Sequence, residues 1–164
     1  MKPAPVALTL IAALLVAGCG PDKAVPPAPT SMETTAPRHV HAAPHGGTLV
    51  EIGEHTYTIE FVRDAEAGKL SAYILDGHAE NFIRIAAKSF DVIATLPGGA
   101  QTITLNAKAD PATGEKVGDT SLFEGQADWL KTTPVFDAAV ARLNIHGTSV
   151  LNIAFNFPKG NEGM

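Results

Sequence analysis

Histidine is the residue type whose placement in this chain points most directly to chemistry. The chain contains six histidines, and His39, His41 and His45 fall within one short segment. In an extended chain His39 and His41 project to the same side, because side chains alternate along a strand. Neutral imidazole is the commonest metal ligand in proteins near neutral pH. This segment is therefore expected to supply ligands to a metal site.

A turn later in the chain offers two further ligands for the same site. Asp76 and His78 flank Gly77 directly after an apolar stretch, so one carboxylate and one imidazole are presented together. Of the other histidines, His55 is expected to be merely exposed at the start of a strand, and His146 to have a structural role in a hairpin turn. The alternative interpretation is a polar linker whose histidines bind nothing, since a histidine-rich tract is only a compositional signal.

The ligand types that the sequence lacks restrict the metal and the chemistry. Only one cysteine is present, and the three methionines lie far apart, so soft ligands for Cu(I) are missing and Zn²⁺, Cu²⁺ or Ni²⁺ is favoured. No G-x-S-x-G, H-E-x-x-H or P-loop pattern occurs, so an enzyme is not expected. The formal net charge is -5 and no basic run occurs, which argues against nucleic acid as a partner.

The amino terminus has the pattern of a secretory signal. Lys2 precedes an apolar run over residues 6–17, which is shorter than the about 20 apolar residues of a membrane span. The sequence Val16-Ala17-Gly18-Cys19 resembles the lipobox of bacterial lipoproteins. That resemblance implies removal of residues 1–18 and acylation of Cys19. The alternative is an ordinary signal in which the cysteine is incidental.

Gly20 and the segment after it indicate where the domain is held. Several acyl chains give stable attachment to a membrane where one chain would not. By resemblance to the sorting rule of Gram-negative lipoproteins, glycine rather than aspartate after the cysteine implies the periplasmic face of the outer membrane. Residues 19–43 are rich in proline and alanine, which favours an extended, semi-rigid linker between the lipid and a folded domain.

Residues 44–160 are expected to form an all-β domain, an antiparallel β-sandwich similar in general shape to immunoglobulin and cupredoxin domains. Apolar and polar residues alternate over residues 57–61 and 101–107, as in half-buried strands. Further strands are predicted over residues 82–86 and 90–96, with turn residues between them.

The carboxy-terminal part predicts a hairpin and contains one ambiguous stretch. Two strands flank the turn His146-Gly147, and the inward face of the second strand is expected to carry Leu151, Ile153, Phe155 and Phe157. Before this hairpin, residues 127–131 favour a helical turn, while residues 134–140 are compatible with helix or strand.

The domain entrance resembles a known sequence pattern. Residues 44–50, Pro-His-Gly-Gly-Thr-Leu-Val, followed by Gly53 and the strand 57–61, resemble the small N-terminal β domain of periplasmic adaptor subunits of heavy-metal efflux pumps. They are also similar to short secreted proteins with the same His-Gly-Gly opening. The similarity covers residues 44–85 and implies a periplasmic β domain near metal traffic, with His45 as the motif histidine, either as a ligand or as a structural residue. The heptad pattern of an adaptor's long helical hairpin is missing, so the resemblance concerns location and domain type.

These patterns together predict a lipid-anchored periplasmic module that binds a divalent transition metal. A metal-efflux protein or another envelope protein is the expected partner, besides the membrane itself. The alternative is a structural or interaction lipoprotein that docks an envelope partner and binds no metal.

Overall fold

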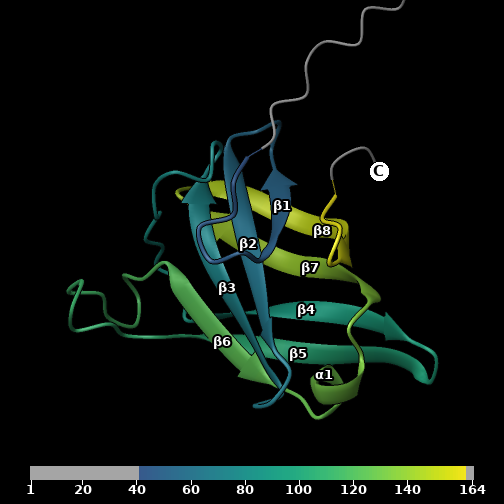
Figure 1. Cartoon of the computed structure of the whole chain (residues 1–164). Helices are drawn as coiled ribbons and strands as arrows, with labels where there is room; N and C mark the ends of the chain where they lie inside the picture. Colours follow the sequence, from purple (N-terminus) through teal and green to yellow (C-terminus); the bar gives the residue numbers. More distant parts are fainter. Residues whose placement is uncertain (1–40, 162–164) are drawn as a thin grey trace, which may run out of the picture. The chain divides into compact units, whose positions relative to one another are not determined.

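The computed structural model describes residues 41–161, nearly all of them in strands and the turns between strands (Figure 1). The predicted signal segment 1–18, Cys19, His39 and most of the predicted linker lie outside the described residues. The elements are β1 Thr48–Ile52, β2 Tyr57–Asp64, β3 Lys69–Asp76, β4 Ser89–Leu96, β5 Gly99–Ala107, β6 Leu122–Gln126, α1 Trp129–Thr132, β7 Phe136–Ile145 and β8 Thr148–Phe157. No helix in this part of the chain is long and apolar enough to cross a membrane.

The all-β, antiparallel fold class is confirmed, and the sandwich consists of a single sheet that curls onto itself. Its strand order is β1-β2-β3-β6-β5-β4-β7-β8, and every pairing is antiparallel. The sheet is nearly closed into a barrel. The two halves of this sheet, β1-β2-β3-β6 and β5-β4-β7-β8, therefore face each other across one core (Figure 1).

Aromatic side chains fill the space between the two halves. Phe61 of β2 stacks on Phe155 of β8 with ring centroids 4.7 Å apart, and Phe90 of β4 meets Phe123 of β6 edge-on at 5.2 Å. All four side chains are buried. Because aromatic rings remove large apolar areas from water, these contacts between the halves contribute strongly to the stability of the closed sheet.

The two halves are joined by a short junction between β5 and β6. Only Asn106 with Glu124 and Ala107 with Phe123 are paired there. Next to these pairs β5 passes directly over Gly125, where a Cβ atom would lie 2.6 Å from the carbonyl oxygen of Thr104. The close approach of the two strands at the junction therefore requires glycine at this position.

Several local predictions are confirmed and others are wrong. The helical turn is α1, and residues 136–145 are strand β7. The predicted strand over residues 82–86 is wrong, because this segment makes only the isolated bridges Leu75–Phe82 and Ile85–Thr120. The hairpin of β7 and β8 is confirmed, but the inward orientation of Leu151 is wrong. Leu151 is 54% exposed and its neighbour Val150 is buried, because Asn152 adopts a left-handed φ of 49° and reverses the alternation.

The junction at Gly125 gives a testable expectation for stability. The substitution Gly125→Ala should lower the free energy of unfolding by about 1–3 kcal/mol, because the new methyl group meets backbone and buried side chains. The control is Gly98→Ala in the turn between β4 and β5, where a Cβ atom meets nothing within 4 Å. Urea denaturation of both variants measures the difference, and equal midpoints would contradict the close approach.

Candidate metal centre

The turn between β1 and β2 is folded so that His55 returns to the end of β1. Gly53, Glu54 and His55 adopt left-handed φ values of 61°, 52° and 66° in succession. Such a run is rare for residues other than glycine. It places Nδ1 of His55 3.0 Å from Oε2 of Glu51, with 64% of the His55 side chain exposed and 18% of the Glu51 side chain. A histidine and a carboxylate are thus held together at one end of the sheet.

The turn after β3 packs directly against this first turn. Gly77 lies against the carbonyl group of His55, and a Cβ atom at this position would collide with that carbonyl. Glycine therefore permits the two turns to touch. The contact brings His78 to the same end of the molecule, where its ring centroid lies 5.5 Å from that of His41.

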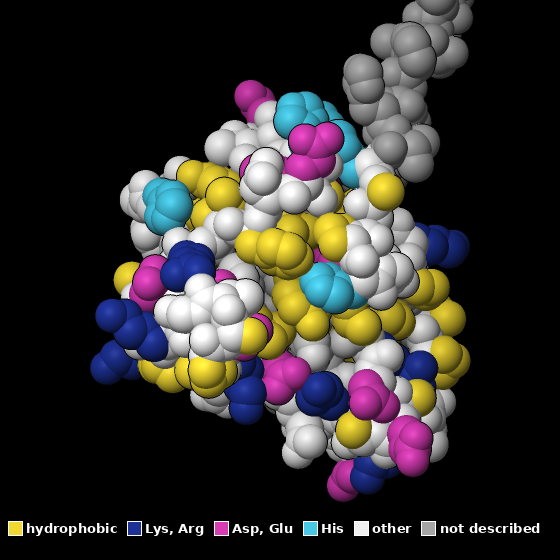
Figure 2. Space-filling model, turned by 60° about the vertical axis from the view of Figure 1, so that its left-hand side comes forward, with side chains coloured by type: hydrophobic (Ala, Val, Ile, Leu, Met, Phe, Trp, Pro, Cys, Tyr) yellow, Lys and Arg dark blue, Asp and Glu magenta, His cyan; other side chains and the backbone are white. Residues whose placement is uncertain are grey.

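His41, Glu51 and His55 form a compact group of potential metal ligands. Each offers one ligand atom, and these atoms all lie within 4.8 Å of one another. Oε1 of Glu51 is buried and has no hydrogen-bond partner among residues 41–161. Figure 2 shows histidine side chains next to acidic ones at this end of the molecule. Two imidazoles and a carboxylate are a donor set suited to borderline divalent ions.

Strand β1 is also held in place by Asn161, at the end of the described chain. The side-chain amide of Asn161 donates to the carbonyl of Glu51 at 2.9 Å, and its oxygen accepts the Glu51 amide at 2.8 Å. This paired contact fixes the backbone of Glu51. The carboxylate of Glu51 therefore projects from a rigid position, as a ligand on a preorganised site should.

Of the ligands predicted from the sequence, the structure brings His41 and His78 together and places Asp76 elsewhere. Both oxygens of Asp76 are used within its own loop: Oδ1 accepts the amide of Glu80 at 2.9 Å, and Oδ2 accepts the side-chain amide of Asn81 at 2.6 Å. Partial burial would raise the pKa of Asp76, but these hydrogen bonds lower it below its ordinary value. Asp76 therefore shapes the loop that presents His78 and is not part of the His41 cluster.

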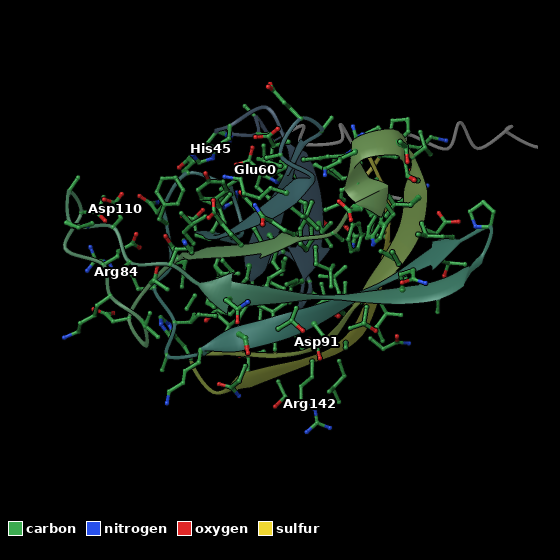
Figure 3. All side chains as sticks on the ribbon, turned by 90° about the horizontal axis from the view of Figure 1, so that it is seen from below. His45, Glu60, Arg84, Asp91, Asp110 and Arg142 are labelled. Carbon is green, nitrogen blue, oxygen red and sulfur yellow. The ribbon has the colours of Figure 1, made fainter. Side chains whose placement is uncertain are left out.

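His45 also lies outside the cluster, because it is bound to a buried carboxylate. Its Nδ1 is 2.8 Å from Oε2 of Glu60, and its backbone amide donates to Oε1 at 2.8 Å. The amide of Gly47 donates to the same Oε1 at 2.8 Å. Glu60 is fully buried, and Figure 3 shows it beside His45. The motif histidine thus supports the fold through a carboxylate on the outer face of β2.

The two glycines after His45 are explained by this contact. Gly46 adopts a left-handed φ of 68°. A Cβ atom on Gly47 would be 2.8 Å from Cγ2 of Val62 and 2.9 Å from Cγ of Glu60, as well as touching the Phe61 carbonyl. Only glycine lets the segment lie flat on β2 so that its amide groups reach the carboxylate.

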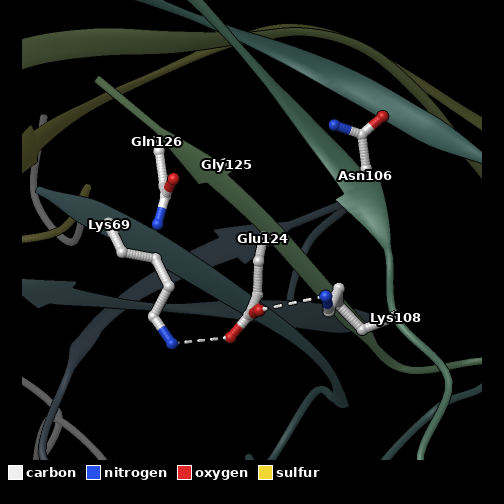
Figure 4. A pocket seen from close by; sticks show the side chains of 6 residues that line it. All are labelled: Lys69, Asn106, Lys108, Glu124, Gly125 and Gln126. Carbon is white, nitrogen blue, oxygen red and sulfur yellow. Dashed lines mark hydrogen bonds and ion pairs between the residues drawn. The ribbon is translucent and has the colours of Figure 1, made fainter. Parts of the chain in front are cut away.

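A second cluster of polar side chains lies at the junction of β5 and β6, and it is formed by two lysines and one glutamate. Lys69 and Lys108 approach the two oxygens of Glu124 at 2.9 and 3.7 Å in a groove of about 340 Å³ (Figure 4). Burial would raise the pKa of Glu124, but the hydrogen bond and charge of Lys69 lower it below the ordinary value. The carboxylate is satisfied by its two lysines and by the hydroxyl of Ser71, which donates to Oε1 at 3.2 Å.

His55 and Glu51 are the site residues that the sequence analysis missed. The sequence feature that could have indicated them is a turn at Gly53 between two strand-like stretches. This turn has a carboxylate, Glu51, on one side and an imidazole, His55, on the other. No protein-family model, curated protein or solved structure matches this chain. The function of the chain must therefore be inferred from the geometry of the described residues.

The buried carboxylate of Glu60 leads to a second expectation for stability. The substitution Glu60→Ala removes three hydrogen bonds and leaves donors of His45 and Gly47 without their partner, so the free energy of unfolding should fall by about 1–3 kcal/mol or more. Glu66→Ala, which alters an exposed turn residue, is the control and should change it by less than about 0.5 kcal/mol. If the two variants unfold at the same denaturant concentration, the Glu60 contact contributes nothing.

Proposed function

We propose that this chain is a lipid-anchored periplasmic module that binds one divalent transition metal ion through His41, Glu51 and His55, with His78 as a fourth ligand. The observation that carries the proposal is the group of three ligand atoms within 4.8 Å of one another. Glu51 and His55 are new to the ligand set expected from the sequence, whereas His45 and Asp76 are no longer part of it. His39, which was also expected, lies outside the described residues.

The environment of Glu51 favours a metal over a simple ion pair. One oxygen, Oε2, is already 3.0 Å from His55, whereas Oε1 is buried without a partner in the described chain. A buried carboxylate oxygen without a partner costs free energy unless a cation or a donor satisfies it. A metal ion between Glu51 and the imidazoles would satisfy it.

The chemistry of the ligands and the exposure of two of the histidines also support metal binding. Imidazole and carboxylate suit Zn²⁺, Cu²⁺ or Ni²⁺, and thiolate or thioether ligands are not part of the cluster. His55 and His78 are exposed, so the ion would be reached from solvent. An accessible site of this kind is suited to taking up and releasing an ion.

The metal proposal is tested by calorimetric titration of the Cys19→Ser chain with Zn²⁺, Cu²⁺ and Ni²⁺. Binding at pH 7 should weaken strongly near pH 5, because imidazole must be deprotonated to bind a metal. The substitution His55→Asn should weaken binding by about tenfold or more, since it removes a ligand.

A matched control separates loss of the ligand from strain in the backbone. His146 has a left-handed φ of 49°, close to the 66° of His55, and asparagine tolerates this conformation. His146→Asn should therefore leave the affinity unchanged. If neither variant changes it, the ion binds elsewhere; if the Cys19→Ser chain without either substitution binds no ion, docking of an envelope partner becomes the leading function.

The anchoring part of the proposal rests on the sequence pattern Val16-Ala17-Gly18-Cys19. Acylation of Cys19 should hold the chain in the membrane fraction and allow incorporation of labelled fatty acid. Cys19→Ser should abolish the label, because the acylated sulfur is removed. A labelled Cys19→Ser chain would show that the lipid is attached elsewhere, and an unlabelled wild-type chain would remove the anchor from the proposal.

A further inference from the structure

A cleft of about 500 Å³ lies on the outer face of the sheet, beside β3. Ala72 and Ile74 of β3 belong to the core, so Tyr73 between them faces outward into this cleft. His45 and Phe82 line the same wall, while Arg84, Asp110 and Glu115 line the rest. The volume lies within the range of about 300–1,000 Å³ that is usual for small-molecule sites.

The aromatic wall of the cleft is held rigidly before any ligand arrives. The ring of His45 stacks on Tyr73 with centroids 3.8 Å apart and an angle of 12° between the planes, and Glu60 fixes its Nδ1. Phe82 stands at 61° to Tyr73 with centroids 6.1 Å apart, and it is 48% exposed. A large apolar ring that is exposed at the rim of a cleft can contact a ligand with little cost in side-chain ordering.

Hydrogen bonds of the neighbouring backbone keep Phe82 in place. The amide of Ile83 donates to the carbonyl of Ile74 at 2.8 Å, and the amide of Asp76 donates to the carbonyl of Asn81 at 2.9 Å. The residues on both sides of Phe82 are therefore tied to β3.

The opposite wall carries more negative than positive charge. Nη2 of Arg84 donates to the carbonyl of Thr113 at 2.7 Å, while Nε lies 3.6 Å from Glu115 and Nη1 lies 3.7 Å from Asp119. The guanidinium is thus occupied in holding the 110–121 segment. Asp110 also lines the cleft, so the lining holds two carboxylates and one guanidinium. Glu115 is used within this segment, where its oxygens accept hydrogen bonds from Ser121 and Thr113, and Figure 3 shows Asp110 and Arg84 at the same end of the molecule as His45.

We infer that the Tyr73–Phe82 cleft binds a small organic cation, an alkylammonium or guanidinium group, between its aromatic wall and its carboxylates. The faces of aromatic rings attract cations, and the attraction increases when water is displaced. An anion would face the surplus of carboxylates, and a metal ion would gain nothing from the rings. The cation is either a free amine or the side chain of a lysine or arginine on another protein.

The inference does not depend on the proposed metal site, because the cleft and the His41 cluster share no residue. Titration of the metal-free Cys19→Ser chain is followed by the amide resonances of residues 81–84, 110 and 112–115. The probes are choline and its neutral isostere 3,3-dimethylbutan-1-ol, which differ in charge but hardly in shape. Choline should bind more tightly by about 2- to 30-fold, as expected for a cation–π contact. Equal affinities of choline and its neutral isostere would overturn the inference.

Matched variants locate the contact. Phe82→Leu keeps an apolar side chain but removes the ring, and should weaken choline binding by about 2- to 5-fold; Asp110→Asn should weaken it and reduce its dependence on salt. The control is Leu151→Ala on β8, a position that is 54% exposed compared with 48% for Phe82, and should leave the affinity unchanged. An effect of Leu151→Ala equal to that of Phe82→Leu would overturn the assignment to the cleft.

A last pair of probes separates the two sources of the cation. Putrescine represents free amines, and N-acetyl-arginine methylamide represents a side chain of another protein. Tighter binding of the capped arginine assigns the cleft to a basic protein segment, and tighter binding of putrescine or choline assigns it to a free amine. If none of these cations shifts the resonances of the cleft, the inference is wrong.

Discussion

The hydrogen bonds between the buried carboxylate of Glu60 and the segment at His45 position residues of both candidate sites, the metal centre and the cleft. Glu60 is fully buried on the outer face of β2, and such a group is tolerated only when donors replace the lost water. The segment that enters the domain supplies them: the ring of His45 and the amides of His45 and Gly47. This requirement fixes the segment on the sheet, so His41 before it and the ring of His45 within it acquire defined positions.

Much of the fold is predictable from patterns that can be read locally, and the exceptions have local causes. Alternation of apolar and polar residues over residues 101–107 predicts an inward face with Ile103 and Leu105, and both are buried in β5, because a strand has period two. The prediction fails for Leu151, where the left-handed Asn152 reverses the alternation. Nothing in residue type distinguishes this asparagine from one that lies in a regular strand. The strand predicted over residues 82–86 is missing for a different reason. Phe82 lines a cleft, and its segment meets the sheet only through isolated bridges.

The candidate metal centre could be predicted only in part, because it is assembled by contacts between turns. The abundance of histidine indicated a metal site that included His41 and His78, and the structure places their rings 5.5 Å apart. Bringing in His55 requires the left-handed turn before β2 and the contact of Gly77 with the His55 carbonyl. These are tertiary features, and spacing along the chain does not reveal them. The same limit explains Asp76, whose residue type fits a ligand but whose oxygens close its own loop.

The histidines of this domain show how environment assigns different roles to one residue type. His45 uses Nδ1 for a buried carboxylate and a ring face for Tyr73, so it is a fixed aromatic wall. His55 is exposed, and its Nδ1 contacts one carboxylate oxygen of Glu51. The second oxygen of Glu51 has no partner in the described chain. A satisfied carboxylate makes its histidine structural, whereas an unsatisfied one leaves room for a cation between them. The state of the carboxylate, more than the presence of histidine, therefore separates the structural position from the candidate ligand.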